Sequence, residues 1–114
     1  MVDLKVNVTS MAKQNKQHLE YNGVVVPIMN FLNSLPQCKA INIHGSVFCE
    51  RGTPDITGSI QGRSFWFECK KSPKEEAEDI QKWRLKQWRS TGAIAERVDD
   101  VQQVREILKR EGLI

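Results

Sequence analysis

The sequence has little cysteine, little histidine and no long apolar run. Its 114 residues include two histidines and three cysteines, Cys38, Cys49 and Cys69. An odd number of cysteines without Cys-X-X-Cys spacing argues against a disulfide framework and a zinc knuckle. We therefore interpret the cysteines as reduced, mostly small buried hydrophobic residues. Because no apolar run approaches the roughly 18 residues of a membrane span, we do not expect a membrane protein.

The N-terminal residues also lack the signs of an export signal, namely a sustained apolar region and a small-residue cleavage site. We therefore expect a cytoplasmic location. The chain contains no internal repeat, no low-complexity tract and no Pro/Gly/Ser-rich linker. Its length suits one compact domain spanning residues 1–114, in which residues 1–14 form a flexible or dimerising arm.

The excess of positive over negative charge is small, with a formal net charge of +3, but basic residues are concentrated in one stretch. The stretch 82–89, KWRLKQWR, carries four bases, two tryptophans and no acid. Such a cluster is typical of phosphate binding, although a packed tryptophan face with a solvated basic face is an equally valid interpretation. The candidate DNA contacts are Lys71, Lys74, Lys82, Arg84, Lys86 and Arg89.

The first predicted helix covers residues 18–35. Apolar residues recur there at helical spacing, at Val24, Ile28, Phe31 and Leu35. Pro27 cannot donate a backbone hydrogen bond, so the helix must kink there or begin again near Val26.

The middle of the chain is predicted to be β-structure. Residues 39–44 and 46–49, on either side of Gly45, suit a bulged strand or a short hairpin. Residues 55–60 and 63–70 then suit the two strands of a hairpin that turns at the intervening Gln-Gly.

The rest of the chain is predicted as helix, strand and helix. A helix from Lys74 begins with acids and ends with bases and a glycine, as suits its dipole. A strand at 93–98 follows, and Asp99 or Asp100 caps a last helix that ends at Gly112.

Two carboxylates and a lysine converge in the predicted hairpin. Side chains alternate along a strand, so Glu68 and Lys70 share one face, and the turn returns Asp55 alongside Glu68. His44 has no ligand-spaced partner and is interpreted as structural or as a polar contact near the site. Hard oxygen ligands without a histidine cluster favour Mg²⁺ or Mn²⁺ over zinc. A carboxylate-held metal with an adjacent lysine suits phosphodiester hydrolysis.

The spacing Pro54-Asp55, twelve residues, then Glu68-Cys69-Lys70 resembles the PD-(D/E)XK nuclease superfamily. GTPDITG, FWFECKK, a helix with Ile80-Gln81-Lys82-Trp83, and STGAIAERVDDVQQV together resemble its VRR-NUC (virus-type replication-repair nuclease) family. The resemblance covers residues 18–110. It implies an α/β, restriction-endonuclease-like αβββαβα core, whose mixed central sheet has helices on both faces.

The same resemblance implies residue roles. Asp55 and Glu68 would be metal ligands together with the backbone carbonyl of Cys69, and Lys70 would be the catalytic lysine. Glu20 would be the acid that the family places on its first helix, and a further metal ligand. Gln81 would be the family's helix glutamine, and the helical wheel also turns it inward, where a buried amide needs a partner.

The resulting hypothesis is a Mg²⁺-dependent DNA endonuclease, for which Mn²⁺ would substitute. A small domain has little surface for reading bases, so recognition of DNA structure is favoured. Stand-alone members resemble phage or prophage proteins that act on four-way (Holliday) junctions in the bacterial cytoplasm, and symmetric cleavage of a junction requires a homodimer. The alternatives are a nuclease for flaps, single strands or nicked duplex, and a catalytically silent nucleic-acid-binding module.

Overall fold

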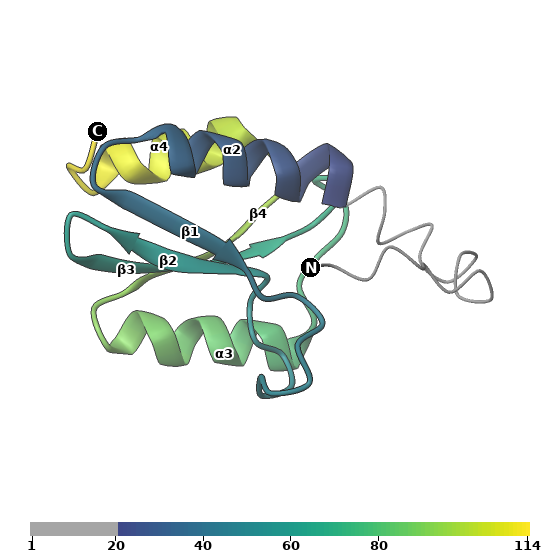
Figure 1. Ribbon diagram of the computed structural model, residues 1–114. Helices are drawn as coiled ribbons and strands as arrows, with labels where there is room; N and C mark the ends of the chain where they lie inside the picture. Colours follow the sequence, from purple (N-terminus) through teal and green to yellow (C-terminus); the bar gives the residue numbers. More distant parts are fainter. Residues whose placement is uncertain (1–20) are drawn as a thin grey trace.

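The computed structural model describes residues 21–114, and the predicted arm and Glu20 lie outside these residues. One four-stranded sheet separates two layers of helices (Figure 1). The elements, in chain order, are η2 (Tyr21–Val25), α2 (Val26–Ser34), β1 (Cys38–Asn42), β2 (Ile56–Ile60), β3 (Arg63–Cys69), α3 (Asp79–Ser90), β4 (Ile94–Val98) and α4 (Val101–Arg110). No helix in this part of the chain is both long and apolar enough to cross a membrane.

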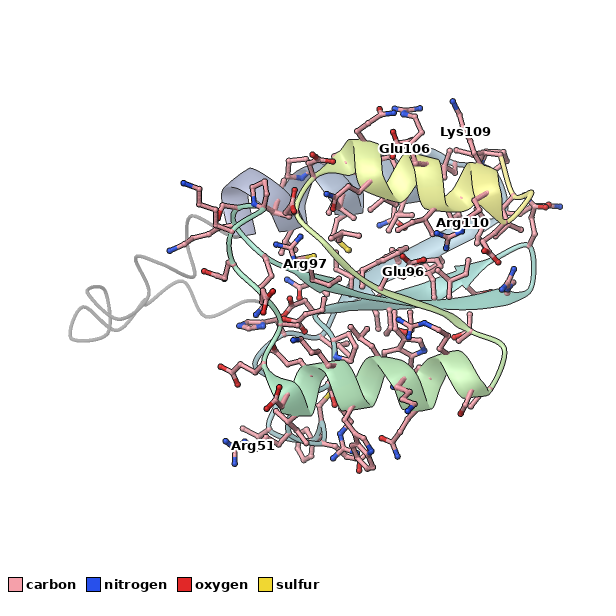
Figure 2. The ribbon with its side chains drawn as sticks, turned by 180° about the vertical axis from the view of Figure 1, so that it is seen from behind. Arg51, Glu96, Arg97, Glu106, Lys109 and Arg110 are labelled. Atoms are coloured by element: carbon pink, nitrogen blue, oxygen red, sulfur yellow. The ribbon has the colours of Figure 1, made fainter. Side chains whose placement is uncertain are left out.

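The sheet is mixed, with strand order β1-β2-β3-β4. The first three strands are antiparallel neighbours, whereas β4 runs parallel to β3. A parallel neighbour requires a crossover connection, which α3 supplies. Helices α2 and α4 cover one face of the sheet and α3 covers the other (Figures 1 and 2). The predicted αβββαβα arrangement is therefore confirmed.

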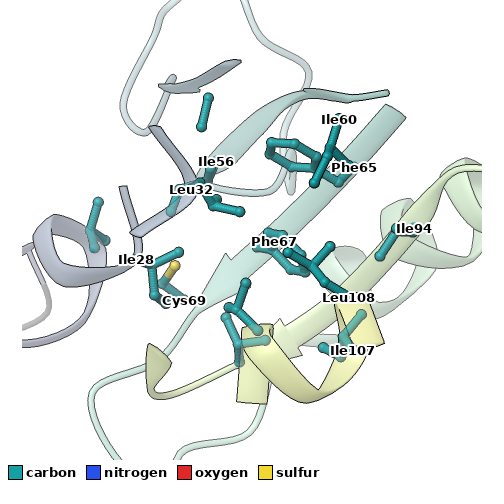
Figure 3. Packing of buried hydrophobic residues seen from close by; sticks show 14 of the residues in the cluster. Ile28, Leu32, Ile56, Ile60, Phe65, Phe67, Cys69, Ile94, Ile107 and Leu108 are labelled. Carbon is teal, nitrogen blue, oxygen red and sulfur yellow. The ribbon is translucent and has the colours of Figure 1, made fainter. Parts of the chain in front are cut away.

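The main hydrophobic core lies between the sheet and the α2–α4 layer (Figure 3). Phe65, Phe67 and Cys69 alternate along β3, point into this core and are almost inaccessible to solvent. The helices contribute fully buried side chains such as Leu32 and Leu108. Since β3 is an inner strand with helices on both faces, its opposite side chains are covered as well.

The α3 side of β3 is closed by aromatic stacking. The rings of Trp66 and Trp88 are stacked, with centroids 3.8 Å apart and 17° between their planes, and Leu85 of α3 is buried as well. Trp88 therefore lies on the face of α3 that packs against the sheet, as one of the two interpretations of residues 82–89 predicted.

Close packing also explains a glycine in β2. A Cβ atom at Gly58 would lie 1.9 Å from the Lys39 carbonyl oxygen and 2.7 Å from the Phe65 ring. Only a residue without a side chain lets the neighbouring strand approach this closely.

The first helix is interrupted next to Pro27, as the sequence predicted. Because Pro27 has no N–H, the usual helical bond to the carbonyl of Gly23 cannot form, and residues 21–25 form a π-helical turn instead. The regular helix α2 then begins at Val26, with Pro27 in its first turn, where proline is tolerated.

One predicted strand and one predicted helix start are wrong. Residues 46–49 form a turn in the long β1–β2 loop rather than a strand. The helix predicted from Lys74 begins only at Asp79, because tertiary bonds hold the preceding segment in an irregular conformation. At the last helix, Asp100 is the N-cap and accepts a bond from the backbone of Gln103.

Candidate active site

The two predicted carboxylates are neighbours at one end of the hairpin. The β2–β3 register pairs Ile56 with Phe67, so the preceding Asp55 comes to lie beside Glu68. Both are almost completely buried, with 4% and 2% of their surface exposed. Two adjacent buried carboxylates repel unless a proton or a cation lies between them.

Asp55 is held from two sides. Its Oδ2 accepts a hydrogen bond of 2.8 Å from the backbone N–H of Cys69, and its Oδ1 contacts Nδ1 of His44. The Cys69 side chain lies in the core on the other face, so any part of Cys69 in the site is backbone. His44 therefore orients Asp55, which matches the interpretation of His44 as a polar contact near the site.

Glu68 uses one oxygen for contacts within the protein. Its Oε2 accepts a hydrogen bond of 3.1 Å from Gln81 Nε2 and lies 3.4 Å from Lys70 Nζ. Its Oε1 is buried, yet it has no hydrogen-bond partner in the described part of the chain. A buried charged oxygen without a partner is costly, so this atom marks a place for a proton or a cation.

The electrostatics of Glu68 agree with this geometry. Burial, followed by the charge of Asp55, raises the pKa of Glu68 from 4.5 to about 8, although Lys70 opposes the shift. Glu68 therefore holds a proton at neutral pH when no cation is near. A divalent cation at Oε1 would displace this proton.

Gln81 is fixed by the start of α3. Its Oε1 accepts a hydrogen bond of 2.8 Å from the backbone N–H of Glu78, which leaves Nε2 as the group that donates to Glu68. The same side chain thus caps the helix and binds the buried carboxylate. The sequence indicated an inward-facing amide, and the structure identifies these two partners.

Lys70 lies one residue beyond the end of β3, with 8% of its surface exposed. Its backbone N–H donates to the carbonyl of Val98 at 2.9 Å, so β4 holds the chain at this point. A nearly buried ammonium group is thereby kept next to the carboxylate pair, where it can balance negative charge.

A pocket of about 230 Å³ opens beside Asp55 and Gln81. The β1–β2 loop, residues 43–53, forms most of its wall, and His44 is part of it. Asp55, the carboxylate that lines this pocket, can thus be approached from solvent along the loop.

The segment between β3 and α3 is held by Arg97 of β4. The guanidinium donates to the carbonyl oxygens of Ser72, at 2.7 Å, and Glu75, at 2.6 Å, and pairs with Asp99. These bonds explain why α3 does not begin at Lys74. No sequence pattern identified Arg97, because the two carbonyl groups that it binds, those of Ser72 and Glu75, lie 25 and 22 residues away in the chain.

The six candidate DNA contacts have different surroundings. Lys82 and Arg89 line a pocket of about 490 Å³ between α3 and β4. Arg84 donates to the Arg51 carbonyl at 2.9 Å and is therefore largely occupied in holding the β1–β2 loop. Lys71 pairs with Glu75 at 3.8 Å, while Lys74 and Lys86 are exposed.

Among residues 21–114 there is no cluster of three or more histidine, cysteine, aspartate or glutamate residues that could hold a metal ion. Asp55 and Glu68 provide a hard-oxygen pair, and the unpartnered Oε1 of Glu68 fits a cation. Glu50, the acid before Asp55 in the described chain, is exposed and pairs with Arg84.

The fold is similar to that of a solved protein described as a VRR_NUC domain protein. The two structures align with a TM-score of 0.63 over 80% of this chain and 86% of the other, at 17% sequence identity. No protein-family model matches the sequence, and no curated protein matches it. At this identity the likeness establishes the fold, and the fold expected from the VRR-NUC resemblance is therefore the one observed.

Proposed function

We propose that this protein is a metal-dependent DNA endonuclease of the VRR-NUC family, within the PD-(D/E)XK superfamily. The observation that carries the proposal is the buried carboxylate pair, in which Oε1 of Glu68 has no partner among residues 21–114 while Lys70 lies 3.4 Å from Oε2. A purely structural ion pair would not require a second buried acid. The aligned VRR_NUC domain protein supplies independent support through its fold.

Asp55, Glu68 and the backbone carbonyl of Cys69 are the proposed metal ligands, with Glu20 as the third acid. When bound, Mg²⁺ or Mn²⁺ would lower the pKa of a water molecule and stabilise charge on the phosphate. His44 and the Cys69 N–H hold Asp55 in a fixed orientation, and Gln81 does the same for Glu68. Lys70 orients the attacking water or offsets the negative charge that develops on the phosphate.

The substrate that we propose is branched DNA, with the four-way junction as the leading candidate. A homodimer would present two sites for symmetric cleavage in the cytoplasm. Flaps, single strands and nicked duplexes are the alternative substrates. A catalytically silent nucleic-acid-binding module is the rival from another class, and the complete Asp55, Glu68 and Lys70 set argues against it.

Cleavage of matched, labelled DNAs tests the proposal. Junction, flap, nicked and linear duplexes of the same sequence are incubated with the protein in Mg²⁺, Mn²⁺ or EDTA. We expect metal-dependent cutting of the junction, and equal cutting of all four DNAs would contradict the junction preference. Lys70→Ala should abolish cutting and leave DNA binding intact, whereas equal cutting by this variant would contradict the mechanism.

Manganese offers a direct test of the ligands. In a crystal soaked with Mn²⁺, anomalous density between Asp55 and Glu68 is expected, and its distance to Glu20 decides whether that acid is a ligand. Density elsewhere would show that the buried pair does not bind the metal.

A further inference from the structure

The tip of the β1–β2 loop presents two apolar side chains to solvent. Phe48 is 95% exposed and its neighbour Val47 is 87% exposed. Single exposed apolar residues are common, but an aromatic ring with almost its whole surface in water contributes nothing to the core. The position of this loop beside the active site indicates what such a ring can contact.

The base of the loop is firmly attached to α3. Arg84 donates to the Arg51 carbonyl at 2.9 Å and lies 3.4 Å from the Glu50 carboxylate. Gly52, at a φ of +83°, packs against Ile80 so closely that a Cβ atom would lie 2.7 Å from the Ile80 side chain. The residues at the base of the loop are therefore fixed against α3, and the loop tip extends from them into solvent.

The same loop lines the pocket of the candidate active site. Its two arms, 43–46 and 49–53, form the pocket wall, whereas Val47 and Phe48 do not line it. His44 contacts Asp55 directly. Because a chain extends by at most about 3.6 Å per residue, the Cα atom of Phe48 lies within about 14 Å of that of His44. This span corresponds to about four base steps of duplex DNA.

The surroundings of the tip contain an exposed cation, Arg51, and aromatic groups as well as the exposed acid Glu50, which pairs with Arg84. Arg51 is exposed and points to solvent beyond the end of α3 (Figure 2). On the neighbouring surface of α3, Trp83 is 50% exposed, and the Arg84 guanidinium lies 4.8 Å from its ring centroid. Aromatic rings interleaved with arginines are the usual composition of surfaces that bind unpaired bases.

We propose that Phe48 stacks on an unpaired base within about four nucleotides of the phosphate that the enzyme cleaves, while Arg51 contacts the DNA backbone there. This inference rests on the proposed nuclease function and assigns the preference for branched DNA to the β1–β2 loop. A fully paired duplex offers no free base face to Phe48, whereas a fork, flap or junction does. The tip thus contributes selectively to the binding of DNA with unpaired bases.

Binding is measured by fluorescence anisotropy in Ca²⁺ and, separately, in EDTA, so that the result does not depend on cleavage. The probes are a labelled fork with unpaired arms and a linear duplex of the same sequence. Phe48→Ala is compared with Phe48→Trp, which keeps a stacking ring, and with Val47→Ala as the neighbouring control.

We expect Phe48→Ala to weaken binding of the fork by between about 5-fold and about 150-fold, the range that loss of one stacked base produces. Binding of the duplex should change by less than about 2-fold. Phe48→Trp should bind the fork like the wild type, and Val47→Ala should have a smaller effect than Phe48→Ala. Quenching of 2-aminopurine in the unpaired arm, lost in Phe48→Ala, would report the stacking itself.

Three results would overturn the inference. One is an equal loss of affinity for fork and duplex, or no loss for either. Another is a change of sedimentation coefficient in Phe48→Ala, which would make Phe48 a subunit contact. The third is wild-type binding to anionic lipid vesicles that Phe48→Ala abolishes. If the fork data agree but the wild type cuts no DNA in Mg²⁺, the base-stacking role of Phe48 stands, whereas the proposed nuclease function fails and with it the link to a cleaved phosphate.

Discussion

Replacing Glu68 with glutamine should stabilise the metal-free protein at neutral and alkaline pH. Glutamine has the shape of a protonated glutamate and no charge, so it avoids the repulsion from Asp55. Its carbonyl oxygen can accept the bond from Gln81, and its amide nitrogen can occupy the position of the unpartnered Oε1. Of the two described carboxylates in the buried site, only that of Asp55 would then remain.

The magnitude follows from the pKa of Glu68, which rises from 4.5 to about 8 in the folded protein. Between these values the folded state keeps a proton that the unfolded state releases, so the free energy of unfolding falls as the pH rises. The fall is at most about 1.4 kcal/mol per pH unit. Across the whole window, the advantage of Glu68→Gln should therefore grow by roughly 5 kcal/mol at most.

Urea denaturation of wild type and Glu68→Gln in EDTA, at several values between pH 4.5 and pH 9, measures this difference. Glu106→Gln, an exposed substitution on α4, serves as the control because it should leave the pH dependence unchanged. In Mg²⁺ above pH 8, the wild type should instead be more stable than Glu68→Gln. The metal stabilises the charged carboxylate pair of the wild type, whereas the variant has lost one of the proposed metal ligands.

Two outcomes would refute the reasoning. If wild-type stability in EDTA, relative to Glu68→Gln, stays constant or rises between pH 5 and pH 8, Glu68 is not held protonated. If Mg²⁺ stabilises both proteins equally, Glu68 does not contact the metal.

Three other substitutions test separate parts of the structure. His44→Ala frees Oδ1 of Asp55, so the Mg²⁺ concentration that gives half-maximal thermal stabilisation should rise about 10-fold or more, and an unchanged value would show that His44 does not orient this ligand. Gly58→Ala places a Cβ atom against the Lys39 carbonyl and should destabilise the protein by several kcal/mol in urea denaturation, whereas a loss below about 1 kcal/mol would contradict the close strand contact. Arg97→Lys removes the bidentate contacts that hold the segment before α3, so amide hydrogen exchange there should accelerate selectively, and uniform protection would contradict the clamp.

The hairpin and its charges could be predicted from the sequence because they depend on local rules. Turn residues set the hairpin, and alternation along β3 assigns Phe67 and Cys69 to one face and Glu68 to the other. Asp55 then has to lie beside Glu68 once the two strands pair. The interruption at Pro27 was equally predictable, since a missing backbone donor acts within one helical turn.

The first residues of α3 could not be predicted in this way. The acids after Lys74 favour a helix start, yet Arg97 binds the carbonyl oxygens of this segment from another strand. Long-range bonds of this kind override local propensity because several charge-assisted contacts outweigh a few tenths of a kcal/mol per residue. The β1–β2 loop shows the same limit, since residues 46–49 have a strand-like composition but pair with no strand among residues 21–114.

By itself, the sequence determined which groups meet at the end of the hairpin, namely Asp55, Glu68 and Lys70. The tertiary structure decided their chemical state. The packing of α3 over the sheet covers Glu68 and brings Gln81 to one of its oxygens, whereas the other oxygen has no partner within the part of the chain that the structure describes. Burial depends on every element that covers the site, and for this reason the raised pKa and the place for a cation are properties of the fold.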